Sequence, residues 1–178
     1  MAVLIEGISV VIRRSAIMDK FPGGWEGFLS DVPNQTLCAD DELARVGFMI
    51  PADAESYIKR LERFGLRYLV DGLAVDVVVA DQQRGFAATC NWAEFGQVSL
   101  DEESGRRVAA CQAKNSTLTT LVSPAGWQYQ GSLSQTFGFV PSDHVDKSLK
   151  FLRHENGVDV YLNKLTGKEV YIGGTGRS

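Results

Sequence analysis

Residues 43–80, LARVGFMIPADAESYIKRLERFGLRYLVDGLAVDVVVA, decide the fold that this sequence predicts. Apolar residues alternate over 43–50, as they do along a half-buried strand. Residues 51–64 then carry apolar side chains at three- and four-residue spacing, which predicts an amphipathic helix. Its apolar members are Ala54, Tyr57, Ile58, Leu61 and Phe64. Pro51 suits the first helical position, and Gly65 suits the position that follows the last.

Two strands joined by a tight turn are predicted after this helix. Asp71-Gly72 is the strongest hairpin signal in the chain, because both residues tolerate positive φ. Residues 66–70 precede the turn, and the β-branched run of 73–80 follows it. A helix packed over these strands would bury both apolar faces. We therefore predict an α+β fold, in which residues 43–80 form a βαββ unit of a mostly antiparallel, twisted sheet.

The chain outside this unit predicts further strands and one more helix. Residues 4–12 resemble a single strand, and residues 22–28 resemble a glycine-rich turn. Ser142 can cap a helix over about 143–154. A closing hairpin follows, with strands at 158–162 and 169–172.

Length and composition are those of an ordinary globular protein. The 178 residues are 44% apolar and 22% charged, which argues against disorder. We expect residues 1–95 to form an α+β portion and residues 96–178 a β-rich portion with the last helix and hairpin, packed together as one domain. The net charge of −4 argues against nucleic acid and anionic membrane as partners. No apolar run approaches the length of about 20 residues that spans a bilayer.

Cysteine usage and the N-terminal residues predict a cytoplasmic location. Cys38, Cys90 and Cys111 are an odd number, and no CxxC pair exists, so we expect free thiols in a reducing compartment. The N-terminal sequence MAVLIEGISVVIRR has no basic leader before its apolar run, and Glu6 interrupts that run. It therefore predicts a first strand rather than a signal peptide.

Two carboxylates stand within apolar strand patterns. Glu6 shares its face with apolar residues, and Asp76 lies within the last strand of the βαββ unit. A buried carboxylate of this kind is either a metal ligand or general base, or a strand-end residue that faces water. The two histidines, His144 and His154, form no HxH or HExxH pattern, so no catalytic set is identified.

Two segments combine aromatic and polar side chains. Trp25 and Glu26 stand among glycines, and Trp127 and Tyr129 stand among glutamines and serines. Aromatic side chains supply contact area and polar groups supply direction, so these four residues are candidates for ligand binding. The alternative is that the aromatics pack in the core beside solvated turns.

The stretches RVGFMIPADAESYIKRLERFGLRYL (45–69) and VDVVVADQQRG (75–85) resemble a known family. They are similar to the second βαββ module of the vicinal-oxygen-chelate superfamily, the glyoxalase and bleomycin-resistance relatives. The resemblance extends over residues 43–95. It implies a metal-dependent enzyme whose metal ligands would fall at Glu6, on the first strand, and at Glu94, in NWAEFG.

Three classes of function follow from these observations. The first is a non-enzymatic binding or interaction protein of bacterial type, comparable to toxin-neutralising immunity proteins, with a protein or a small molecule as its partner and no cofactor. The second is an enzyme of the chelate type, which would use a divalent metal on Glu6 and Glu94. The third is a ligand-sequestering domain built on Trp25 and Trp127. A homodimer is compatible with each of them.

Overall fold

The computed structural model describes residues 1–100, 103, 106–116, 120–136, 149–155, 158–163 and 169–173. A five-stranded sheet lies at its centre, in the order β3-β4-β2-β7-β8, and every neighbouring pair is antiparallel. Its strands are β2 (Ile8–Arg13), β3 (Cys38–Ala39), β4 (Leu43–Phe48), β7 (Val77–Asp81) and β8 (Gly85–Phe86). The predicted α+β class is confirmed.

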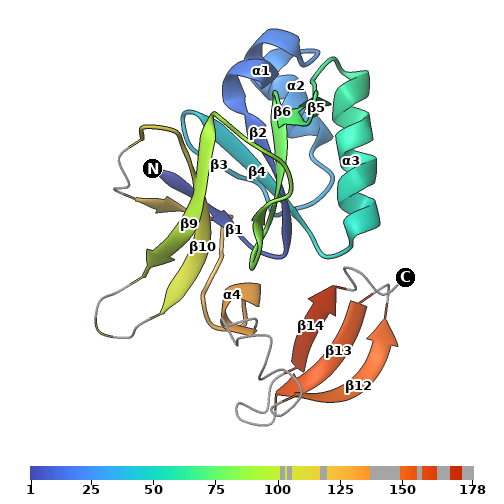
Figure 1. Ribbon diagram of the computed structural model, residues 1–178, viewed down its shortest axis with the longest axis vertical. Helices are drawn as coiled ribbons and strands as arrows, with labels where there is room; N and C mark the ends of the chain where they lie inside the picture. Colours follow the sequence, from blue (N-terminus) through green and yellow to red (C-terminus); the bar gives the residue numbers. More distant parts are fainter. Residues whose placement is uncertain are drawn as a thin grey trace.

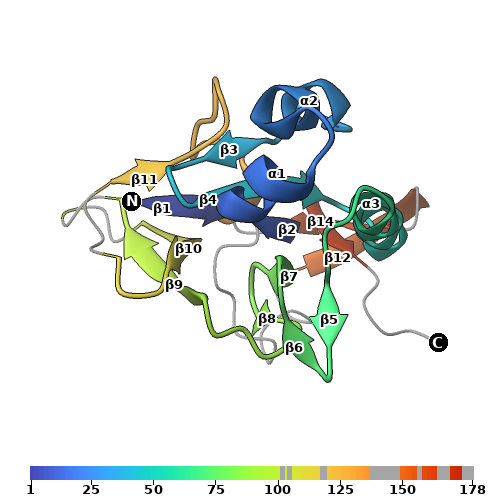
Figure 2. The same cartoon turned by 90° about the horizontal axis from the view of Figure 1, so that it is seen from above.

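Helices cover one face of the central sheet, and a second sheet covers the other (Figures 1 and 2). The helices are α1 (Arg14–Lys20), α2 (Gly24–Asp31) and α3 (Pro51–Arg63). The second sheet has the order β11-β1-β10-β9, with β1 (Ala2–Ile5), β9 (Ala93–Ser99), β10 (Arg107–Ala113) and β11 (Leu121–Val122). Side chains alternate accordingly along β2, where Val10 and Ile12 face the helices and Val11 faces the second sheet.

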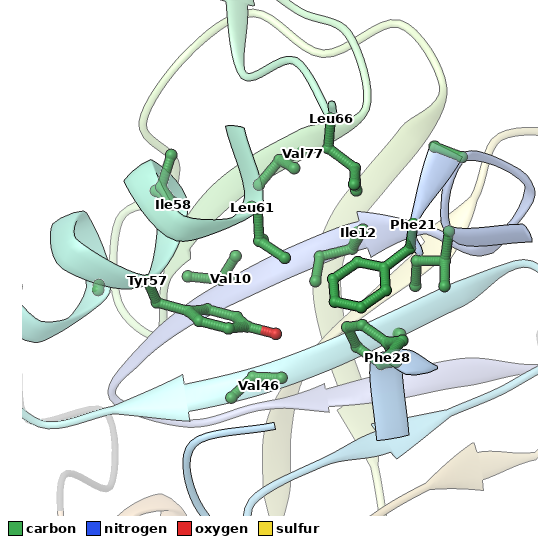
Figure 3. Close-up of a cluster of buried hydrophobic side chains, with 14 of the residues drawn as sticks. Val10, Ile12, Phe21, Phe28, Val46, Tyr57, Ile58, Leu61, Leu66 and Val77 are labelled. Carbon is green, nitrogen blue, oxygen red and sulfur yellow. The ribbon is translucent and has the colours of Figure 1, made fainter. Parts of the chain in front are cut away.

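The amphipathic helix predicted over 51–64 is confirmed as α3. Its buried residues are Ala54, Tyr57, Ile58 and Leu61, and Pro51 occupies its first turn. Figure 3 shows Tyr57 and Leu61 reaching from α3 toward Val10 and Val46 of the sheet. Ile50 gives the helix no side-chain cap. The burial of the apolar stripe is therefore the interaction that holds α3 on the sheet.

The Asp71-Gly72 turn is also confirmed, but the strands around it are shorter than predicted. Asp71 and Gly72 both have positive φ, at 52° and 79°, and they join β5 (Leu69–Val70) to β6 (Leu73–Ala74) in a separate small hairpin. The chain then enters the central sheet as β7. Strand β2 lies between β4 and β7, so the unit is a split βαβ arrangement rather than a run of adjacent strands.

The first strand and the glycine-rich turn differ from their predictions. The predicted strand over 4–12 is two strands in two sheets, because Gly7 has a φ of +58° and turns the chain between them. Of the residues predicted as a turn at 22–28, Pro22 and Gly23 do form a turn, whereas residues 24–28 form the first part of α2. Gly27 allows this helix to approach the preceding turn, since a Cβ there would lie 1.9 Å from the Pro22 carbonyl oxygen.

The C-terminal helix predicted over 143–154 is wrong for residues 149–154. These residues belong to β12 (Leu149–Glu155), which pairs with β13 (Val158–Asn163), and β13 pairs with β14 (Glu169–Gly173) as the predicted hairpin. The register shifts between Phe151 and Arg153, so a bulge breaks the alternation that marks a strand. Leu149 and Leu152 are three residues apart, which is also the spacing of apolar residues on one face of a helix, and this spacing led to the wrong prediction. Residues 143–148 lie outside the described residues.

The C-terminal sheet stands apart from the central sheet in Figure 1. The short helix α4 (Leu133–Thr136) lies between them and contacts both β10 and β14. Within the described part of the chain, we find no helix that is both long and apolar enough to cross a membrane.

Replacing Tyr57 by phenylalanine is expected to raise the free energy of unfolding by about 1 kcal/mol. The ring is 4% exposed, and its hydroxyl has no hydrogen-bond partner among the described residues, so it is desolvated without compensation. Burial also raises the pKa of Tyr57. Urea denaturation of both proteins measures the difference. Tyr68→Phe is the control, because Tyr68 is only half-buried; a destabilised Tyr57→Phe variant would contradict the interpretation.

Candidate functional site

A cleft of about 480 Å³ opens between the end of β4, the start of α3 and the loop that precedes α4. This volume falls in the range of small-molecule sites in proteins. The apolar residues that line it are Phe48, Met49, Ile50, Pro124, Ala125, Trp127 and Leu133. The polar residues are Glu6, Asn34, Gln35, Thr36, Arg45 and Asp53. The two groups come from four separate segments of the chain, which the two sheets bring together.

The carboxylate of Glu6 is anchored through one of its two oxygens. Oε1 accepts hydrogen bonds from the Trp127 indole Nε1 at 2.8 Å and from the Ser134 hydroxyl at 2.7 Å. The Ser134 backbone N–H adds a third bond to the same oxygen at 3.3 Å. Glu6 is 8% exposed and Ser134 is fully buried. These bonds join the β1–β2 connection to Trp127 and to α4, which follow more than 120 residues later in the chain.

The other oxygen of Glu6, Oε2, has no hydrogen bond from any of the described residues. Glu6 lines the cleft and also a second hollow, and Trp127 lines both of them. Three donors on one oxygen fix the carboxylate in position, while the second oxygen keeps its lone pairs open. A fixed acceptor in a cleft with both apolar and polar lining residues is a typical feature of a ligand site.

Arg45 lies behind Glu6 and is 3% exposed. Its guanidinium donates to the Glu6 carbonyl at 2.9 Å, to the Thr36 carbonyl at 3.0 Å and to the Ser9 hydroxyl at 2.9 Å. Burial lowers the pKa of Arg45, and the nearby Cys38 and Glu6 oppose that effect. Arg45 therefore acts as a brace that holds two backbone segments of the cleft in place.

One wall of the cleft is a compact polar turn over residues 34–36. The Asn34 amide donates to the Gly47 carbonyl at 2.8 Å, and the Thr36 hydroxyl accepts from the Gly47 N–H at 2.6 Å. Gly47 is required here, because a Cβ would lie 2.4 Å from the Arg45 Nη2. Because Gly47 has no side chain, both the turn and the Arg45 guanidinium can pack closely against β4 at this position.

Gln82 fixes the kink that follows Glu6. Its side-chain oxygen accepts from the Gly7 N–H at 3.0 Å, and its backbone N–H donates to the Gly7 carbonyl at 2.9 Å. Its side-chain amide also donates to the Leu133 carbonyl at 3.4 Å. Gln82 is 3% exposed, so these bonds are shielded from water. Gln82 therefore links the kink at Gly7 to the first residue of α4.

Of the six residues predicted as metal or ligand contacts, the structure brings two together, Glu6 and Trp127. Glu94 lies on β9, is exposed, and accepts from the Gln112 amide at 3.3 Å. It lines a different groove from Glu6. No group of three or more His, Cys, Asp or Glu residues within the described ranges could hold a metal ion.

The remaining predicted ligand residues lie elsewhere. Trp25 is on α2, where it stacks on Phe28 at 5.2 Å and lies 4.0 Å from the Arg14 guanidinium. Glu26 is exposed on the same helix. Tyr129 packs against the hydrophobic core between the central sheet and the second sheet. The Arg106 guanidinium carbon lies 5.5 Å from the centre of the Tyr129 ring. None of these three lines the cleft.

Asp76, the other carboxylate in a strand pattern, has a structural role. Its Oδ2 accepts from Lys20 Nζ at 2.6 Å and from the Arg67 backbone N–H at 2.8 Å. Asp76 is 4% exposed, and these partners compensate its burial by joining α1 to the turn before β7.

Sequence reasoning did not single out Arg45, Thr36 or Gln82, and it noted Ser134 only among the polar residues that follow Trp127. Arg45 gave a usable signal, since it is a charged residue in the middle of a strand that is buried on both faces. Thr36 and Gln82 are polar residues in loops, where polar residues are normal, and Ser134 lies in the short helix α4. Their importance depends on contacts with residues far away in the chain.

Stability is expected to fall as the pH rises above about 8.5, the ordinary pKa of a thiol in an unfolded chain. Burial raises the pKa of Cys111 and of Cys38, and Arg45 partly offsets the shift at Cys38. The folded state therefore keeps thiols protonated that ionise after unfolding. Urea denaturation at pH 7.5 and pH 10 measures the loss. Cys111→Ala should show a shallower pH dependence, and an unchanged slope in that variant would contradict this assignment.

Comparison with protein-family models, with curated proteins and with solved structures gives no match for this chain. The resemblance of residues 43–95 to the vicinal-oxygen-chelate superfamily therefore stays a prediction. The function has to be argued from the geometry of the cleft.

Proposed function

We propose that this protein is a non-enzymatic binding protein and that the cleft between Glu6 and Trp127 holds its ligand. The observation that carries the proposal is the Glu6 carboxylate, which is fixed through Oε1 and open at Oε2. A rigid polar group in the lining of a cleft gives orientation, while the apolar lining residues give contact area. The proposal belongs to the binding class that the sequence predicts, with a small molecule as the partner.

The chemistry of the lining supports binding rather than catalysis. Arg45 reaches the cleft, but its guanidinium is occupied by two backbone carbonyls and a hydroxyl. Asn34 and Thr36 are likewise bonded to Gly47. Among the described lining residues there is no histidine or cysteine that could act as a base or nucleophile beside Glu6.

Binding at this cleft is expected to shift the NMR signal of the Trp127 indole N–H, because that group is bonded directly to Glu6. The protein labelled with ¹⁵N is titrated with a panel of small polar and apolar compounds, and Trp127→Phe assigns the indole signal. We expect saturable shifts at Trp127 and at the Phe48 amide, with the Trp25 indole unchanged as an internal control. A panel that moves no signal at the cleft, or that moves Trp25 alone, would overturn the proposal.

A further inference from the structure

The geometry points to an organic cation with N–H donors, a primary ammonium or a guanidinium on an apolar stem, as the ligand of this cleft. This inference rests on the proposed function and names the chemical class of the ligand. It is carried by the open oxygen of Glu6, by the charges around it and by the apolar walls.

The first support is that, among the described residues, no cationic group donates a hydrogen bond to the buried carboxylate of Glu6. Its bonds come from an indole, a hydroxyl and a backbone N–H, all of which are neutral. Arg45 donates to the carbonyl of Glu6 instead of to its carboxylate. Buried carboxylates in proteins are normally paired with a cation or a metal. Arg45 therefore interacts with this carboxylate only through space, and a ligand cation at Oε2 would add a direct, charge-assisted hydrogen bond.

The second support is the balance of charge around the cleft. Its described lining holds two carboxylates, Glu6 and Asp53, against the single guanidinium of Arg45. Since Arg45 is 3% exposed and donates to three protein oxygens, it has little capacity left for an anionic ligand. Asp53 is exposed in the first turn of α3, at the rim. An anion entering here would meet a rim carboxylate first and the Glu6 carboxylate next.

The third support is the match between an apolar stem and the walls. Phe48, Ile50 and Leu133 line the cleft beside Glu6, and Trp127 offers an indole ring whose N–H is already used. An alkyl or aryl stem gains from contact with such walls. The open oxygen accepts a hydrogen bond, which a primary ammonium or guanidinium donates and a quaternary ammonium cannot.

Four compounds that differ only in their polar end test this inference: hexylamine, hexanol, hexanoate and hexyltrimethylammonium. Titrations followed at the Trp127 indole N–H give a dissociation constant for each. We expect hexylamine to bind about 10- to 100-fold more tightly than hexanol, as for a charge-assisted hydrogen bond. Hexanoate should bind most weakly, and added salt should weaken hexylamine but not hexanol.

Glu6→Gln and Glu94→Gln are the matched variants. Glutamine at position 6 keeps an oxygen that can accept from Trp127 and Ser134, so the loop stays anchored while the charge is removed. We expect Glu6→Gln to lose the preference for hexylamine. Glu94→Gln should keep it, because Glu94 lies in another groove.

The outcomes separate this inference from the proposed function. If hexanol and hexylamine bind equally, or Glu6→Gln still prefers hexylamine, the cationic ligand is wrong while binding at the cleft stands. If none of the four compounds binds but other members of the panel shift Trp127, the ligand class is again wrong and the cleft remains a binding site. If no compound of either set shifts Trp127, both proposals fail.

Discussion

Replacing Arg45 by methionine is expected to lower the free energy of unfolding by about 3–5 kcal/mol. Methionine fills much of the volume of the arginine stem but donates no hydrogen bond. The Glu6 carbonyl, the Thr36 carbonyl and the Ser9 hydroxyl would then each lose a donor, and the bonds to Glu6 and Ser9 are buried. A buried polar group without a partner costs about 1–3 kcal/mol. Urea denaturation followed by fluorescence measures the change.

Arg60→Met is the matched control for this experiment. Arg60 is also bonded to protein oxygens, those of Asp31, but its side chain is 54% exposed and water replaces the lost partner. We expect a clearly smaller loss in this variant. Equal losses for Arg45→Met and Arg60→Met would show that Arg45 does not brace the cleft. The Trp127 indole signal adds a second measure, because a displaced Glu6 would move it only in the Arg45 variant.

The parts of the fold that could be predicted from the sequence are those specified by neighbouring residues. The apolar stripe of α3 has a spacing that only a helix places on one face, and Pro51 marks where the helix begins. The Asp71-Gly72 turn needs positive φ at two successive positions, and its two residues tolerate that conformation. In both cases the conformation is decided within a few residues.

The arrangement of the strands could not be predicted in the same way. Alternation in β2, β4 and β7 indicates strands, but it does not show that β2 lies between the other two. The pattern of residues 4–12 continues through Gly7, so the change from one sheet to the other is visible only in its backbone angle. The bulge in β12 produced a helical spacing where the pairing with β13 decides the structure.

The candidate site was predicted as separate residues without their geometry. Glu6 was singled out as a carboxylate among apolar residues, and Trp127 as an aromatic among polar ones. Nothing local links them, because 121 positions separate the two partners of the bond. The prediction of Glu6 with Glu94 came from a family resemblance, and those two residues line different hollows. Long-range contacts made by Gln82 and Ser134 complete the site.

Replacing Gly7 by alanine is expected to lower the free energy of unfolding by about 2–4 kcal/mol. Two effects add at this position. The φ of +58° is strained for any residue with a Cβ, and a Cβ there would lie 2.9 Å from the Phe48 carbonyl oxygen, which is backbone and cannot rotate away. The chain must therefore shift at the residue that follows Glu6, against the bonds that Gln82 makes to both backbone groups of Gly7. Urea denaturation measures the loss.

Gly72→Ala separates the two effects, because Gly72 has a φ of +79° but nothing within 4 Å of an added Cβ. We expect Gly72→Ala to lower the free energy of unfolding by about 1–2 kcal/mol, which is the cost of the positive φ alone. The excess loss in Gly7→Ala then measures the contact with Phe48. The Gly7 variant should also bind hexylamine more weakly, since its Glu6 carboxylate can no longer face both Trp127 and the cleft. If the two glycine variants lose equal stability and Gly7→Ala binds normally, the kink is not what places Glu6 in the cleft, and the bonds from Trp127 and Ser134 are sufficient by themselves.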